Sequence, residues 1–269
     1  MPAALPHARS FVESPYQMIS GKLSRFLARN VPIKKLTMRN ARPLVSFTFD
    51  DAAASACSTG ASLLERYQVR GTFYISGGTC GTASPTGRLA TTDQVKALYT
   101  SGHEIGCHTF SHTPVVGIGR DALAGELDRN RYFLQGILGD IALRNFAYPY
   151  GDMSFATKRY LGEHFDSCRS HTPGVNAGVA DLGLLRSFAL EQRSIGRQGI
   201  VELIAETVRR KGWLIFANHD VGEEPSRFGV QPELLGFALQ AARDAGCELA
   251  TVAQALRMVS GATPNERAS

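Results

Sequence analysis

The sequence predicts an α/β protein in which about seven parallel strands form a distorted (β/α) barrel. Short apolar runs rich in β-branched and aromatic residues alternate along the chain with segments of helical spacing, which is typical of a parallel sheet. The length of 269 residues suits one such barrel, since these folds often fill about 200–250 residues. Apolar residues make up 43% of the chain, enough for a large core, and this excludes wholesale disorder.

Eight segments have the length and composition of strands, and that number favours a barrel over a small open sheet. The clearest are LVSFTF and WLIFAN, which are apolar and bounded by polar residues. The predicted strands are 44–49, 71–75, 103–107, 146–150, 165–170, 184–190, 213–218 and 247–250.

The segments between these strands carry apolar residues at helical spacing. Thr92 and Asp93 are a typical helix start, and Gly102 is a typical helix end. The predicted helices are 52–67, 92–101, 121–138, 154–163, 196–211, 232–245 and a last helix that ends near residue 259.

The formal charge of +5 is unevenly distributed. Residues 1–43 hold eight bases and one acid (8 − 1 = +7), whereas the rest holds 21 bases and 23 acids (21 − 23 = −2). We therefore divide the chain into a basic N-terminal arm (1–43), a main domain (44–260) and a short tail (261–269). Apolar and basic residues at helical spacing between 19 and 29 predict an amphipathic helix in the arm. This helix either packs its apolar stripe across the barrel or contacts an anionic membrane.

Several classes of protein are disfavoured by the composition. No apolar run approaches the ~20 residues of a transmembrane helix. The five cysteines are scattered, odd in number and without a C-x-x-C pair, which predicts buried free thiols. No basic-aromatic motif accompanies the arm, so nucleic acid is not an expected partner. The start of the sequence lacks a signal-type apolar region, so we expect a cytoplasmic protein, with the inner membrane face as a further option.

Polar clusters follow four of the predicted strands, where catalytic groups of parallel barrels lie. These clusters contain Asp50 and Asp51, His108 and His112, the YPYG turn at 148–151, and His219 with Asp220.

His108 and His112 are four residues apart, so one helical turn would bring both imidazoles to one metal ion. Neighbouring carboxylates on an extended strand diverge, so Asp50 and Asp51 cannot both face the same ligand. One of them can complete a site of two histidines and one carboxylate while the other stays free as a base. Such a site leaves open positions for water and substrate.

Together, TFDD (48–51), HTFSH (108–112), FAYPYG (146–151) and NHD (218–220) resemble the motifs of the polysaccharide deacetylases, the NodB-homology group or carbohydrate esterase family four. The motifs stand in the family's order, and the resemblance covers roughly 44–255. It implies a NodB-like barrel of about seven strands and assigns 44–260 as the catalytic domain.

The resemblance also implies roles for five side chains. Asp51, His108 and His112 correspond to the metal ligands. Asp50 corresponds to the catalytic base, and His219 corresponds to the general acid that protonates the leaving amine.

Further residues are expected to contact the substrate. The backbone N–H of Tyr150 corresponds to the donor that holds the oxyanion, and Pro149 and Gly151 complete its turn. His171 follows a predicted strand and is expected to line the substrate groove.

The sequence departs from the family pattern at several positions. Ala52 replaces the glycine that commonly follows the aspartate pair, and no arginine directly precedes Pro149. We predict that Arg186 replaces that arginine as the partner of Asp50. The acid that tunes the catalytic histidine is not evident, and Asp181 is a weak candidate.

The expected reaction is hydrolysis of an N-acetyl group from an amino sugar or an oligo- or polysaccharide. One divalent metal ion activates the water; zinc is our first choice, with cobalt, nickel and manganese as alternatives. Two alternatives stay open. One is hydrolysis of another C–N or ester bond on the same fold, such as an O-acetyl, formyl or cyclic amide group. The other is an inactive carbohydrate-binding protein.

Overall fold

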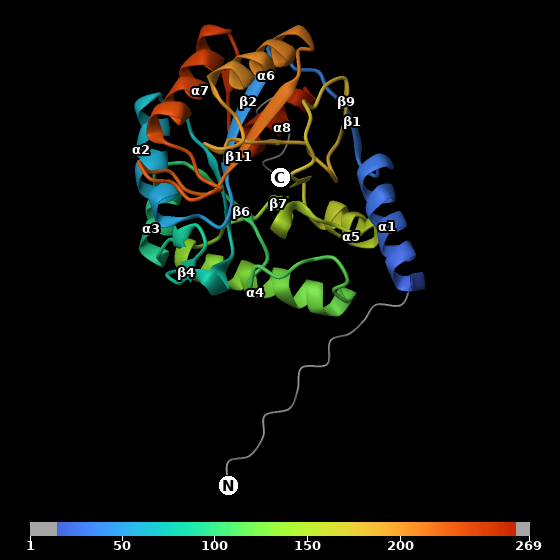
Figure 1. The fold of residues 1–269 in the computed structure, drawn as a ribbon. Helices are drawn as coiled ribbons and strands as arrows, with labels where there is room; N and C mark the ends of the chain where they lie inside the picture. Colours follow the sequence, from blue (N-terminus) through green and yellow to red (C-terminus); the bar gives the residue numbers. More distant parts are fainter. Residues whose placement is uncertain (1–14, 262–269) are drawn as a thin grey trace.

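The computed structural model describes residues 15–261, with side chains from residue 21 onward (Figure 1). Its centre is a curled parallel sheet in the order β10-β11-β2-β3-β6-β7-β8, with β12 pairing to β2. The predicted barrel-like fold of about seven parallel strands is confirmed. The strands of this sheet are β2 (Leu44–Phe49), β3 (Thr72–Ile75), β6 (Glu104–Cys107), β7 (Asn145–Ala147), β8 (Ser167–Arg169), β10 (Phe188–Ala189), β11 (Trp213–Asn218) and β12 (Glu248–Leu249).

Helices surround the curled sheet, as Figure 1 shows, and they occupy the segments in which helical spacing was found. Except for α1, each helix follows a strand and packs its apolar side towards the sheet. The helices are α1 (Pro15–Asn30), α2 (Ala61–Arg66), α3 (Thr92–Thr100), α4 (Arg120–Leu138), α5 (Phe155–His164), α6 (Arg197–Arg209), α7 (Pro232–Asp244) and α8 (Val252–Ser260), with a π-helical turn η1 (Ala56–Gly60) before α2 and 3-10 turns η2 (Gly77–Thr79) and η3 (Pro149–Gly151).

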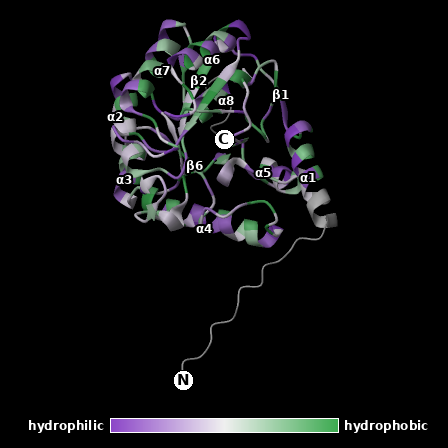
Figure 2. Cartoon of the chain, in the orientation of Figure 1, coloured by the Kyte–Doolittle hydropathy of each residue, from purple (hydrophilic) through white to green (hydrophobic). Residues whose placement is uncertain are grey.

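The two central strands explain how the site is assembled. All six residues of β2 and all six of β11 are buried, and Figure 2 shows hydrophobic colour along both. Their parallel register pairs Leu44 with Trp213 and Phe49 with Asn218. Asp50 and His219 directly follow the last pair, so both emerge at the same edge of the sheet.

Two smaller strand pairs were not predicted. The first joins β1 (Lys35–Thr37) and β9 (Val179–Asp181) in antiparallel register, and the second is the short hairpin of β4 (Ala83–Ser84) and β5 (Gly87–Arg88). Each is two or three residues long, too short to show a periodic pattern.

The arm from residue 15 onward packs against the barrel. The Nζ of Lys158 on α5 donates to the carbonyl oxygens of Ala28 and Val31 at 2.7 and 2.8 Å, at the C-terminal end of α1. Arg25 forms an ion pair of 2.8 Å with Asp152. The predicted amphipathic helix is therefore present and docked. The domain boundary at residue 43 stays a prediction, and the predicted tail lies almost wholly outside the described residues.

The cysteines are free thiols, as predicted, and Cys107, Cys168 and Cys247 are buried. Burial raises the pKa of Cys107 to about 11 and that of Cys168 to about 12, which leaves both thiols protonated and unreactive at neutral pH. Within residues 15–261, no helix is both long and apolar enough to cross a membrane.

Candidate metal and catalytic site

Loops at the carboxyl ends of the parallel strands form the candidate site, and their backbones are unusual. Seven non-glycine residues of the described chain have a positive φ, and five of them lie in these loops. The five are Asp51, Ala52, Thr109, His112 and Tyr150. Ala52 has a φ of 51°, so it adopts the left-handed conformation that glycine, common in the family at this position, takes without steric cost. Such strain gathers where a fold holds functional side chains in place.

Asp51, His108 and His112 converge as predicted, but residues 108–112 form an irregular turn with a positive φ at Thr109 and His112, and the predicted helical turn is absent. The Oδ1 atom of Asp51 lies 3.1 Å from Nε2 of His112 and 3.5 Å from Nε2 of His108. The Nδ1 atom of His108 lies 2.8 Å from the carbonyl oxygen of Ala147, a contact in which Nδ1–H donates. This bond leaves the Nε2 lone pair of His108 free for a metal ion, as in most protein metal sites. The three side chains therefore fit one divalent ion.

The ionisation of His108 also suits a metal ligand. Burial lowers the pKa of His108 to about 4, although the nearby carboxylates of Asp50 and Asp51 act in the opposite direction. The imidazole is therefore neutral at pH 7, and only the neutral ring can donate its lone pair to a metal.

Glu126 on α4 holds the HTFSH turn that carries both histidines. Its Oε2 atom accepts hydrogen bonds from the backbone N–H groups of Phe110 (3.0 Å) and Ser111 (2.8 Å). Only 6% of Glu126 is exposed. Sequence reasoning missed this residue, because an acidic side chain in a helix normally indicates a solvated face.

The partner of Asp50 is Arg169, and the prediction of Arg186 is wrong. Nη2 of Arg169 donates to Oδ1 of Asp50, and both side chains are fully buried. Arg186 instead donates from Nη1 to the carbonyl oxygen of Pro173 at 3.0 Å. Leu185 forms a parallel bridge with Arg169 and is buried, so its neighbour Arg186 points to the opposite side of the segment.

Asp50 is held in its charged form. Burial by itself would raise the pKa of this carboxyl. The Arg169 guanidinium and the His171 ring outweigh burial, with a smaller effect of His108, and hold the pKa of Asp50 well below its usual range. An ionised carboxylate at neutral pH is the state that a general base requires.

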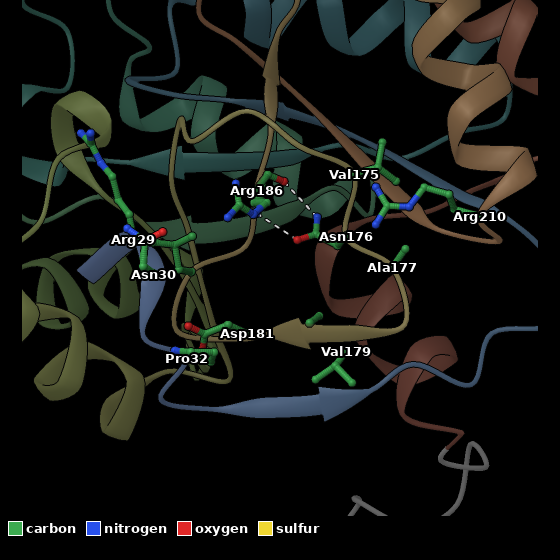
Figure 3. Close-up of a pocket in the computed structure, with 12 residues that line it drawn as sticks. Arg29, Asn30, Pro32, Val175, Asn176, Ala177, Val179, Asp181, Arg186 and Arg210 are labelled. Atoms are coloured by element: carbon green, nitrogen blue, oxygen red, sulfur yellow. Dashed lines mark hydrogen bonds between the residues drawn. The ribbon is translucent and has the colours of Figure 1, made fainter. Parts of the chain in front are cut away.

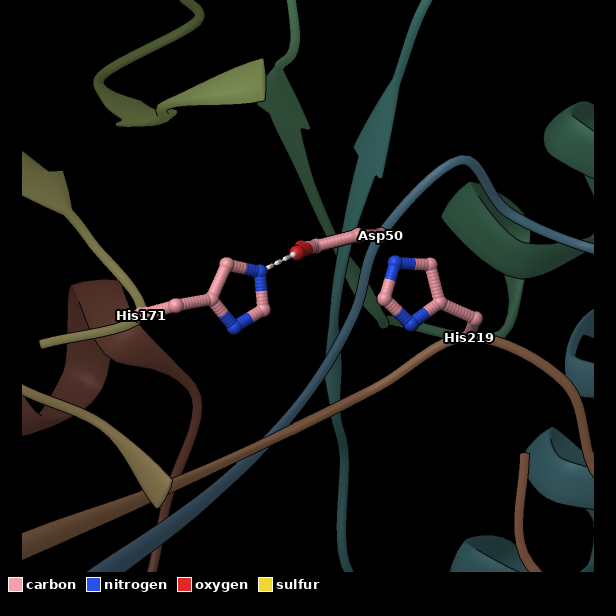
Figure 4. Close-up of side chains that lie close together, drawn as sticks. All are labelled: Asp50, His171 and His219. Carbon is pink, nitrogen blue, oxygen red and sulfur yellow. Dashed lines mark hydrogen bonds and ion pairs between the residues drawn. The ribbon is translucent and has the colours of Figure 1, made fainter. Parts of the chain in front are cut away.

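His171 and His219 complete a second cluster around Asp50 (Figure 4). Nε2 of His171 lies 3.1 Å from Oδ2 of Asp50 and 3.3 Å from Nη1 of Arg169. The rings of His171 and His219 are nearly parallel, with an interplanar angle of 5° and centroids 6.1 Å apart. The ligand atoms of this cluster lie within 4.8 Å of one another, but the Arg169 guanidinium beside Asp50 would repel a metal cation there. Of the two clusters, the Asp51 cluster is therefore the better fit for a metal ion.

Asp181 does not tune His219. Its Oδ2 atom lies 2.6 Å from Nζ of Lys158, and its Oδ1 atom accepts a bond of 3.0 Å from the backbone N–H of Lys34, near α1 and α5. The Nδ1 atom of His219 is buried and has no hydrogen-bond partner among the described residues. His219 instead packs on Phe228, with ring centroids 5.4 Å apart.

The YPYG turn borders both clusters. Tyr150 is 67% exposed, and its ring centroid lies 4.6 Å from that of His112. Pro149 starts the 3-10 turn, which ends the β7 strand earlier than predicted. Gly151 has a φ of 64°, and a Cβ atom on it would lie 2.6 Å from the His171 ring. Glycine is therefore required here, both for the turn and for the position of His171.

Comparisons with known proteins match part of the chain to a family of deacetylases. The family model described as polysaccharide deacetylase matches residues 37–164. A bifunctional xylanase/deacetylase from Pseudobutyrivibrio xylanivorans is 28% identical over 109 residues, which cover 40% of this chain and 16% of that protein. The chain thus matches only a small part of this relative's length.

Solved structures share the fold. A family 4 carbohydrate esterase from Bacillus anthracis superposes with a TM-score of 0.59 at 14% identity, covering 94% of this chain and 97% of that one. A family 4 acetyl xylan esterase from Clostridium thermocellum, in complex with a cobalt ion, gives a TM-score of 0.57 at 21% identity, covering 82% and 93%. Residues 37–164 thus match the polysaccharide deacetylase family model, and the solved family 4 carbohydrate esterases share the fold of the chain.

Proposed function

We propose that this protein removes an N-acetyl group from an amino sugar or an N-acetylated oligo- or polysaccharide, in a metal-dependent hydrolysis. One observation carries the proposal. A three-ligand cluster of Asp51, His108 and His112 lies beside a buried, ionised Asp50 and beside His219. Catalytic metal sites have three protein ligands and an open position, and hydrolases of this type need a base and an acid next to them.

Each residue has a stated task in this scheme. A divalent ion bound by the cluster would lower the pKa of water and polarise the acyl oxygen. Asp50 takes a proton from water as the water oxygen bonds to the acyl carbon, and Arg169 keeps the carboxylate ionised and oriented. The N–H of Tyr150 is the proposed donor to the oxyanion of the substrate, a role worth about 2.7–4 kcal/mol in other acyl-transfer enzymes. His219 donates a proton to the nitrogen as the C–N bond breaks, which releases acetate and a free amine.

The identity of the metal and of the acyl group is part of the proposal. Two imidazoles and a carboxylate suit zinc, our first choice, and also accept cobalt, nickel or manganese. An O-acetyl or formyl group would pass through a similar oxyanion, so these substrates belong in the same assay. The cytoplasmic location also stays a proposal, and lipid-linked or nucleotide-linked sugars or short oligosaccharides are the substrates that fit it.

Acetate release from chito-oligosaccharides and related acetylated sugars tests the function, with mass spectrometry to detect the loss of acetyl groups. The purified protein is assayed after chelation and after metal is restored. We expect activity only with metal, and a loss of at least about a hundredfold in Asp50→Asn, since general bases contribute on the order of 10²–10⁴. Asp166→Asn is the matched control, because Asp166 is an exposed aspartate that lies outside the site. A metal-loaded wild type that acts on no acetylated or formylated sugar would refute the proposal.

A further inference from the structure

The outer face of α1 exposes two large apolar side chains. Leu23 is 55% exposed and Phe26 is 61% exposed. The sequence predicted two options for this apolar stripe: packing across the barrel or contact with a membrane. The helix is docked, but these two members of the stripe do not take part in the docking.

The contacts that dock α1 explain this orientation. Ser24 Oγ accepts a bond of 3.0 Å from the N–H of Phe155, Arg25 pairs with Asp152 at 2.8 Å, and Ala28 is fully buried. At 100° per residue, these positions share one side of the helix. Polar contacts and the buried methyl group of Ala28 thus help to fix α1 on α5, and Leu23 and Phe26 point outward.

The arm that contains α1 also carries an excess of basic residues. Residues 1–14 hold one base and one acid, so the whole excess of +7 in the arm belongs to 15–43. Three of its seven bases contact the barrel: Arg25 and Arg29 form ion pairs with Asp152 at 2.8 and 3.9 Å, and Lys34 donates to two backbone carbonyls. Arg29 is still exposed, and so are the other four bases, Lys22, Lys35, Arg39 and Arg42.

A groove adjoins the C-terminal end of α1, where Arg29 and Asn30 line it (Figure 3). It has a volume of about 270 Å³, and Arg29, Arg186 and Arg210 line it together with the exposed Val179. The carboxylate in its wall, Asp181, is already paired with a buried lysine. The groove is therefore a cationic recess next to apolar side chains.

We propose that the outer face of α1 and this groove form a docking surface for an anionic membrane. Leu23 and Phe26 enter the interfacial layer, and the exposed bases of the arm and the arginines of the groove bind lipid phosphates. Charge complementarity selects this occupant. A symmetric dimer through the same face would bring two copies of this basic surface together, which is unfavourable. A basic face with a few large apolar residues is the composition of interfacial helices.

Vesicle cosedimentation with the full chain tests this surface. Vesicles of phosphatidylcholine alone are compared with vesicles that also contain phosphatidylglycerol, at low and at high salt. We expect binding to the anionic vesicles only, weakened by salt. The double variant Leu23→Ser/Phe26→Ser should lower the partition coefficient by at least about tenfold, and Arg186→Gln/Arg210→Gln should lower it about as much.

Tyr132→Ser is the matched control, because Tyr132 is 65% exposed on α4 and lies outside this face. It should bind as the wild type does, and all variants should keep the wild-type thermal midpoint. Equal binding to neutral and anionic vesicles, or unchanged binding of either double variant, would overturn the proposal. An apolar-dependent dimer in solution without vesicle binding would overturn it in favour of a second copy of the chain. These readouts do not depend on deacetylase activity.

Discussion

Replacement of Arg169 by methionine should strongly destabilise the protein. The Arg169 side chain is completely buried and that of Asp50 is 1% exposed, so the variant leaves a buried carboxylate without its cationic partner. Breaking a buried pair in this way costs about 3–5 kcal/mol in the free energy of unfolding. For a chain of this size, each kcal/mol shifts the thermal midpoint by about 2–4 °C, so we expect a decrease of roughly 10 °C.

The dependence of this loss on pH gives a sharper test. In the wild type the pKa of Asp50 is depressed, so its contribution to stability is present above the unfolded-state pKa and is lost as pH falls through the folded-state value. In Arg169→Met, burial acts with less opposition and raises this pKa. The variant then gains stability, relative to the wild type, as pH decreases towards about 4. The difference between the two proteins should be largest near neutral pH.

Urea unfolding followed by circular dichroism, with a chelator present, measures both effects. The double variant Arg169→Met/Asp50→Asn removes both charges and should be more stable than Arg169→Met alone. Arg186→Met is the matched control and should stay within about 0.5 kcal/mol of the wild type, because Arg186 bonds a carbonyl at the surface. A variant Arg169→Met as stable as wild type at pH 7, or a double variant no better than the single, would show that the pair does not hold the charge of Asp50.

Three other expectations concern the metal and the arm. Added zinc should raise the thermal midpoint of the wild type and of His171→Ala but not of His112→Ala. The stabilisation should be about 4 kcal/mol at a thousandfold excess of zinc over Kd. A shift in midpoint that requires His171 would show that the metal binds at the second cluster. Glu126→Ala leaves two backbone N–H groups of the HTFSH turn without their acceptor, so the zinc affinity measured by calorimetry should fall roughly tenfold. An unchanged affinity would show that the turn keeps its conformation without Glu126. Lys158→Met leaves Asp181 without its cationic partner and removes both hydrogen bonds to the end of α1. It should lower the free energy of unfolding by about 3 kcal/mol and make α1 susceptible to limited proteolysis. The control Arg159→Met should change neither the stability nor the proteolysis.

The sequence predicted the parallel strands well because their burial is continuous. The strand 44–49 and the strand 213–218 were predicted with the bounds that the structure has. The strand predicted at 184–190 is shorter, at 188–189, because the segment before it bends to bridge Arg169. A bend of this kind depends on tertiary contacts and leaves no periodic signal.

The same reasoning applies to the site. His108 and His112 belong to one motif and are four positions apart, so the turn between them brings their rings together. The partner of Asp50 is 119 residues away, on β8, and no local pattern separates Arg169 from Arg186. Only the alternation of side chains at the bridge decides which arginine faces the site, and a shift of one residue reverses that outcome.

The segment 169–171 provides the partners of Asp50, because this chain lacks the arginine that the family pattern has directly before Pro149. The family match ends at residue 164, before Arg169 and His171, yet these two side chains contact both oxygens of Asp50. Gly151 lets the His171 ring lie against the YPYG turn, so one short segment joins the base to the proposed oxyanion donor. Substitution of His171 by alanine should therefore lower kcat more than it raises KM, since it disturbs how Asp50 is oriented and leaves the metal ligands in place. If KM changes alone, His171 contacts the sugar and does not position the base.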